Sequence, residues 1–113
     1  KAYFWKKIQK LLKSKETFMT RVGLILLLSF YVEKEYILKI LQMVKTINSH
    51  EYYVNMGLSW LLAECFIKFP TETLQLLQEK SLPSFVQNKT ISKIRDSYRV
   101  SKKVKDYLKN LKK

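Results

Sequence analysis

Residues 51–70 of the chain read EYYVNMGLSWLLAECFIKFP. The polar residues 48–50 before this stretch are suited to begin a helix, whereas Pro70 cannot continue one but fits the first turn of the next. The stretch therefore predicts a helix over residues 51–69 and a short second helix over 71–78. Apolar spacing places the following residues on the buried side of the longer helix: Tyr53, Met56, Trp60, Leu61 and Ile67.

Apolar residues recur at helical spacing toward both ends of the chain. Further helices are predicted over about 4–13, 15–31, 33–46, 84–98 and 102–113. Ser84 with Gln87 has the spacing of a capping box, and Ser101 is suited to cap the last helix. The residues expected to face the core are Phe18, Val22, Ile25, Leu26 and Ser29 of the second helix, Tyr36, Ile37, Ile40, Leu41 and Val44 of the third, and Ile91, Ile94 and Tyr98 of the sixth.

A repeat underlies this pattern. Alternate helices begin near residues 16, 51 and 84, and the pattern FxxRxxxI at 18–25 aligns with YxxMxxxW at 53–60. Helix pairs at such a pitch are typical of solenoids, in which each pair buries its apolar face against its neighbours. We predict an all-α helical repeat solenoid of about seven helices in antiparallel pairs, with residues 1–113 as one domain. The first helix, which carries Trp5, has no partner in this pairing, so we expect the C-terminal part of a longer solenoid.

The composition argues against several other classes of protein. The chain is 47% hydrophobic, which is too apolar for a disordered segment, and it has only two glycines and two prolines for the turns of a β-sandwich. Cys65 is the one cysteine and His50 the one histidine, so we expect no disulfide within the chain, no metal and no cofactor. The longest uncharged apolar run, residues 22–32, is shorter than the ~20 residues of a membrane-spanning helix.

The net charge of +13 is concentrated at the two ends of the chain. Six Lys, one Arg and one Glu give residues 1–21 a charge of +6, and eight Lys, two Arg and two Asp give residues 84–113 a charge of +8. The middle, residues 22–83, has five Lys and six Glu and a charge of −1. Two basic ends indicate a polyanionic partner; a charged surface that serves only solubility is the alternative.

Three stretches resemble one known family: YYVNMGLSWLL at 52–62, KFPTET at 68–73 and KIRDSYR at 93–99. In their order and spacing they are similar to the C-terminal half of the AlkD-like DNA alkylation-repair family, and the similarity covers essentially all of the chain. The resemblance implies a HEAT-like helical solenoid. It also implies an electropositive concave face of inner helices, on which active members of the family excise positively charged alkylpurines from duplex DNA.

Carried over by position, the resemblance implies roles for two residues of this chain. Arg21 matches a phosphate-binding arginine, and Trp60 matches an aromatic residue beside the lesion. Ala63 stands where active members carry a second arginine, and their catalytic aspartate and its companion tryptophan would lie upstream of Lys1. The resemblance therefore implies DNA binding, with no catalytic residue in this chain, and leaves open whether the intact protein is a glycosylase.

Phosphate binding requires several cations on one surface, since each contact releases condensed counterions. The lysines at 89 and 93 and the arginine at 99 are suited to share one side of the stack. A salt bridge between Arg21 and Glu64 and a core position for Trp60 are the structural alternatives. The candidate DNA-binding residues are Arg21, Trp60, Lys89, Lys93, Arg95, Arg99 and Lys102.

Three functions are compatible with these observations. The first is a module that holds duplex DNA through its phosphates and shape, for excision of alkylated purines by the intact protein. The second is a part of the groove of an active glycosylase, and the third is a non-catalytic nucleic-acid-binding or protein-interaction scaffold. The first predicts a cytoplasmic, nucleoid-associated protein without membrane contact. Apolar surface at the N-terminal end is expected to permit self-association.

Overall fold

The computed structural model describes residues 2–47 and 49–113, and these form seven α-helices without a strand. The helices are α1 (Ala2–Leu12), α2 (Thr17–Phe30), α3 (Ile37–Val44), α4 (Tyr52–Lys68), α5 (Pro70–Glu79), α6 (Ser84–Arg95) and α7 (Lys102–Lys109). The predicted all-α fold is confirmed. Within the described part of the chain, no helix has the length and apolar character needed to cross a bilayer.

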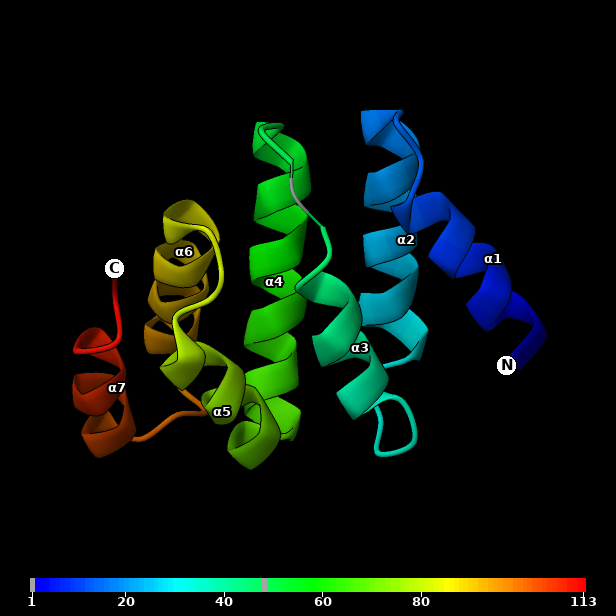
Figure 1. Cartoon of the computed structure of the whole chain (residues 1–113). Helices are drawn as coiled ribbons and strands as arrows, with labels where there is room; N and C mark the ends of the chain where they lie inside the picture. The colour runs from blue at the N-terminus through cyan, green and yellow to red at the C-terminus, as the bar shows by residue number, and fades with distance from the viewer. Residues whose placement is uncertain (1, 48) are drawn as a thin grey trace.

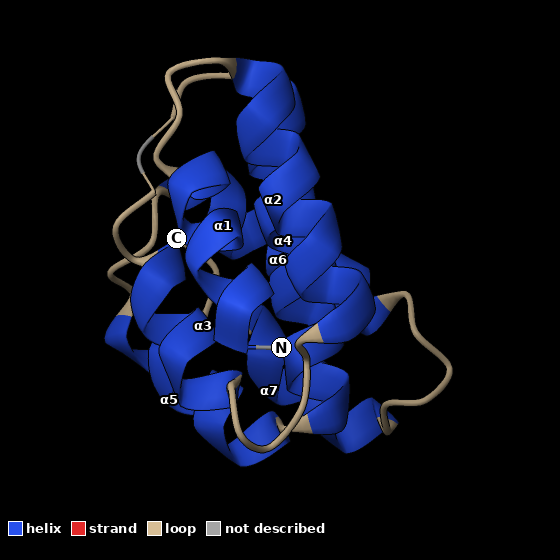
Figure 2. Cartoon of the chain, turned by 90° about the vertical axis from the view of Figure 1, so that its right-hand side faces the viewer, coloured by secondary structure: helices blue, strands red, loops and turns tan. Residues whose placement is uncertain are grey.

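The helices stack in two layers (Figures 1 and 2). Helices α2, α4 and α6 lie side by side in one layer, which we call the inner layer, and α1, α3 and α5 form the outer layer. Consecutive helices run in opposite directions, and α7 closes the stack beside α6, at the end opposite α1. This is the arrangement of a HEAT-like helical repeat.

The core lies between the two layers and along the contacts of α4 with α2 and α6. Burial of each large aliphatic side chain contributes roughly 1.5–3 kcal/mol, so packing between layers supplies most of the stability. Fully buried members of this core are Leu24 and Leu27 of α2, Ile40 of α3, Leu61 and Leu62 of α4, Leu77 of α5, Ile91 and Ile94 of α6, and Leu108 of α7.

Helix α3 buries the side that its sequence predicts. Its single apolar stripe, formed by Ile37, Ile40, Leu41 and Val44, faces the core. Helix α6 buries Ile91 and Ile94 as predicted, but it ends at Arg95. Tyr98 therefore lies in the following loop and is 94% exposed, so the prediction that it faces the core is wrong.

Helices α2 and α4 expose much of the side that was predicted to be buried, although Leu61 of α4 is fully buried as predicted. Phe18 and Ile25 are 70% and 50% exposed, and Tyr53 and Trp60 are 61% and 59% exposed. Ser29 is exposed as well. Both helices are apolar nearly all round, so spacing alone does not select the packed side. The structure selects the side that carries small residues, because these let neighbouring helices approach closely; they are Thr20 and Gly23 of α2 and Ser59 and Ala63 of α4.

Helix α1 packs along α2. A Cβ atom built on Gly23 would lie 3.0 Å from Leu12 Cδ2, which shows how close the two helices are. The Trp5 ring is buried against Tyr31 and Tyr36, with ring centroids 5.4 and 4.9 Å away. Trp5 is therefore buried within this chain, whereas the expectation of a longer solenoid stays a prediction.

The start of α6 also differs from the prediction. Ser84 is the first residue of α6, Pro83 precedes it, and no side chain caps the helix, so the predicted capping box does not form. Gln87 instead lies buried and donates two hydrogen bonds from Nε2, to the carbonyl oxygens of Leu77 (2.9 Å) and Leu111 (3.0 Å). The predicted cap of α7 is confirmed, since Ser101 Oγ accepts from the Val104 N–H at 3.3 Å.

Candidate nucleic-acid interface

The exposed side of the inner layer, which the outer helices do not cover, is the candidate interface. Its residues follow helical spacing along α2, α4 and α6, so each helix contributes one row of side chains. We call this surface the inner face and define it by Phe18, Arg21 and Ile25 of α2, Tyr53, Trp60 and Glu64 of α4, Lys89 and Lys93 of α6, and Asp96 and Arg99 of the chain after α6.

Arg21 lies at the boundary between α2 and α4. Its side chain is exposed, and its Cζ atom is 5.1 Å from the centre of the Tyr53 ring. A cation over an exposed aromatic ring gains about 0.5–1 kcal/mol, which orients the guanidinium without neutralising it. Glu64 pairs with Arg99, so the alternative of a salt bridge between Arg21 and Glu64 is wrong.

Lys93 makes the corresponding contact between α6 and α4. Its Nζ atom is 5.6 Å from the centre of the Trp60 ring. Trp60 is largely exposed, so the alternative of a core position for this tryptophan is wrong. Lys89 precedes Lys93 by one turn on the same side of α6. The Tyr53 and Trp60 rings of α4 thus lie between a cation of α2 and a cation of α6.

Arg99 reaches the inner face from the loop between α6 and α7. Its Nη2 atom donates to Glu64 Oε1 at 2.9 Å, which ties this loop to α4. The loop is shaped by Ser97, whose Oγ accepts from the Arg99 N–H at 3.2 Å. Since the pair uses one donor of a guanidinium that has five, Arg99 keeps further N–H groups for another acceptor.

Two predicted residues lie away from the inner face. Asn88 and Ser92 of α6 face the C-terminal residues, since Asn88 Nδ2 donates to the Lys113 carbonyl oxygen and Lys112 Nζ donates to Ser92 Oγ at 3.1 Å. Arg95 follows them at helical spacing, so it belongs to the same edge of α6. Lys102 begins α7, at the end of the stack. The structure therefore brings together Arg21, Trp60, Lys89, Lys93 and Arg99.

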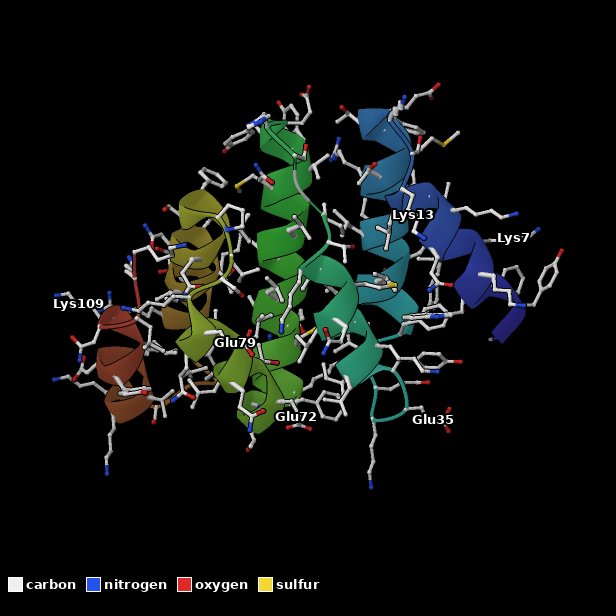
Figure 3. The ribbon with its side chains drawn as sticks, in the orientation of Figure 1. Lys7, Lys13, Glu35, Glu72, Glu79 and Lys109 are labelled. Atoms are coloured by element: carbon white, nitrogen blue, oxygen red, sulfur yellow. The ribbon has the colours of Figure 1, made fainter. Side chains whose placement is uncertain are left out.

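Other lysines of the two chain ends lie away from the inner face, on α1, the turn after it and α7. Figure 3 shows Lys7 and Lys13 at the end of the stack formed by α1, and Lys109 at the opposite end on α7. Glu35, Glu72 and Glu79 lie between them, on the side of α3 and α5. The four cations of the inner face outnumber its two carboxylates, Glu64 and Asp96, so this face is positive although the largest lysine clusters lie elsewhere.

Neither the Cys65 thiol nor the Glu64 carboxylate is placed to act as a catalytic group. Burial raises the pKa of the Cys65 thiol from 9.0 to about 12, and the neighbouring Glu64 carboxylate adds to this increase. A thiol with this pKa is not a nucleophile near neutral pH. The Glu64 carboxylate is held by Arg99, and no group of three His, Cys, Asp or Glu within residues 2–47 and 49–113 is suited to hold a metal ion.

The sequence contained a signal for the aromatic part of this surface. The repeat aligns Phe18 with Tyr53 and Ile25 with Trp60, and all four side chains are exposed. The repeated positions mark a shared surface and not, as predicted, a shared core. No family model, curated protein or solved structure matches this chain.

Proposed function

We propose that this chain binds DNA through the inner face and forms the DNA-binding C-terminal portion of an AlkD-like alkylation-repair protein. One observation carries the proposal: Arg21, Lys93 and Arg99, from three separate segments, lie on one surface, and each is oriented by a side chain of α4. Cations oriented in this way are suited to the phosphates of a duplex laid across α2, α4 and α6.

Binding of this kind depends on phosphates and on DNA shape, not on base identity. The inner face offers guanidinium and ammonium groups, which recognise the backbone of any sequence. Each phosphate contact releases condensed counterions, so affinity falls as salt rises. The test is a titration of a labelled duplex at several salt concentrations, with two unrelated sequences. A flat salt response, or no binding at 50 mM salt, contradicts the proposal.

In the proposed repair protein this chain holds DNA, and excision of the alkylated purine depends on residues outside it. Ala63, which stands where active relatives are expected to carry a second arginine, is buried and offers no phosphate contact. An excision assay on alkylated duplex DNA, run on this chain and on a longer parent protein, tests the division of roles. Base release by this chain alone would contradict it.

An apolar groove at the α1 end of the stack favours an alternative function, that of a protein-interaction scaffold. Helices α1 and α2 enclose an apolar groove of about 500 Å³, lined by Phe4, Lys7, Ile8, Leu11, Leu26, Phe30 and Tyr31. Exposed apolar surface of this kind permits association with a protein or with a second copy of the chain. Sedimentation velocity at increasing concentration tests self-association. A monomer over the whole range would exclude the second copy as the occupant.

A further inference from the structure

The inner face carries large apolar side chains as well as cations. Phe18, Ile25, Tyr53 and Trp60 each expose half or more of their surface on two adjacent helices. Exposed apolar groups gathered on one surface usually mark a binding site. A partner that also contacts these side chains must therefore offer flat apolar surface in addition to negative charge.

Intact duplex DNA does not offer such surface. Its base faces are stacked inside the helix, and the outside presents sugars, phosphates and base edges. Tyr53 and Trp60 lie seven residues apart on α4, so about 10 Å separates them along the helix axis. This distance is about three times the ~3.4 Å spacing of stacked bases in one strand, so both rings can stack on bases only where the strand is unstacked.

Each of the two rings also has a cation beside it, and the two contacts are alike. Arg21 lies 5.1 Å from the Tyr53 ring centre, and Lys93 lies 5.6 Å from the Trp60 ring centre. An aromatic platform next to a cation matches the repeating unit of a single strand, which has one base and one phosphate. Proteins that bind single strands combine these two features, and each stacked base contributes about 1–3 kcal/mol.

We infer that the inner face binds unpaired nucleic acid, with one base stacked on Trp60, another on Tyr53, and the flanking phosphates bound by Lys93 and Arg21. This inference rests on the proposed function of the inner face, and it specifies the substrate as a strand with accessible base faces. It predicts that single-stranded DNA binds more tightly than duplex of the same sequence.

The first experiment compares a fluorescein-labelled 20-nucleotide strand of mixed sequence with its duplex, by anisotropy at 150 mM salt. The strand is expected to bind at least about fivefold more tightly than the duplex. Trp60→Ala and Tyr53→Ala should each weaken strand binding about fivefold or more and change duplex binding less than about twofold. Trp60→Phe retains a ring and should restore most of the affinity.

Leu38→Ala is the matched control, since Leu38 is an exposed apolar residue of α3 in the outer layer. It should leave the affinity for both DNAs unchanged. Equal or tighter binding of the duplex, or equal losses on both DNAs, would overturn the inference and leave the proposed function standing. Failure to bind either DNA, even when the titration is repeated at 50 mM salt, would overturn both.

The two tryptophans provide a second readout. Trp60 is 59% exposed whereas Trp5 is 9% exposed, so a base that stacks on the inner face should quench the fluorescence of Trp60 and not of Trp5. Titration of wild type with the unlabelled strand is expected to quench emission, and Trp60→Ala should abolish this response. Quenching that persists in Trp60→Ala would place the strand elsewhere and overturn the inference.

Discussion

Glu64 and Arg99 are 35 positions apart in sequence, yet their side chains meet on the inner face, where Arg99 Nη2 lies 2.9 Å from Glu64 Oε1. The pair joins α4 to the loop before α7. It also places a carboxylate beside the cations proposed to bind phosphate. Glu64 therefore orients Arg99 and, if the proposed function holds, competes with phosphate for it.

The first prediction concerns this competition. Glu64→Gln removes a negative charge from the inner face and frees Arg99, so nucleic-acid affinity should rise severalfold. The slope of log affinity against log salt should steepen by roughly 0.7–0.9, the value of one added phosphate contact. Glu79→Gln is the control, because Glu79 forms an equally short pair with Lys45 in the outer layer, also at 2.9 Å. Weaker binding by Glu64→Gln would contradict competition.

The second prediction concerns Lys93. Lys93→Gln should weaken binding to all sequences by a similar factor and reduce the salt slope by about 1, since one phosphate contact is lost. Lys39→Gln is the matched control. Like Lys93, Lys39 lies beside an aromatic ring, 5.5 Å from the ring centre of Tyr36, but it belongs to α3 in the outer layer. Equal effects of the two substitutions would show that total charge, not the inner face, determines binding.

The sequence predicts the helices more reliably than it predicts their packed sides. Helix α3 has one apolar stripe, and its buried residues follow from spacing alone. Helices α2 and α4 are apolar nearly all round, so several sides are equally good candidates. The choice depends on small residues such as Gly23 and Ala63, whose importance appears only when a neighbouring helix is in place.

The candidate site was partly predictable for a related reason. Arg21, Trp60, Lys89 and Lys93 lie on regular helices, so periodicity and the repeat bring them to one surface. Arg99 joins them as predicted, but its pairing with Glu64 depends on the path of the loop from 96 to 101, which spacing does not define. Arg95 was also predicted to join the site, because it is basic and near Lys93 in sequence. It lies instead on the edge of α6 toward α7.

The third prediction tests Gln87 as a stabilising residue. Gln87→Leu removes this donor from the carbonyl oxygens of Leu77, which keeps the Lys80 N–H at 3.2 Å, and of Leu111, and loss of a buried partner costs about 1–3 kcal/mol. We expect the free energy of unfolding, measured with urea, to fall by about 2 kcal/mol or more. Gln78→Leu removes an exposed hydrogen bond to Tyr107 and should change it by less than about 0.5 kcal/mol. Equal effects would contradict the role assigned to Gln87.

The fourth prediction concerns the contact between α1 and α2. Alanine in place of a helical glycine normally stabilises a helix by about 1 kcal/mol. At Gly23 the new Cβ would lie 3.0 Å from Leu12 Cδ2 and 3.2 Å from Leu11 Cβ, so these neighbours on α1 must give by a few tenths of an ångström. Gly23→Ala is therefore expected to destabilise the protein by about 1–3 kcal/mol in thermal or urea unfolding. A higher melting temperature would show that α1 moves away at little cost.

The fifth prediction follows from the buried thiol of Cys65. Burial raises its pKa to about 12, so the folded protein retains a proton that the unfolded chain releases above pH 9. The thiol therefore stabilises the fold fully below about pH 9 and progressively less as pH rises toward 12. Urea unfolding of wild type and Cys65→Ala between pH 7 and 10 should show a steeper loss of stability in wild type. A thiol reagent should modify Cys65 only at the rate of unfolding, and rapid modification of folded protein at pH 8 would contradict its burial.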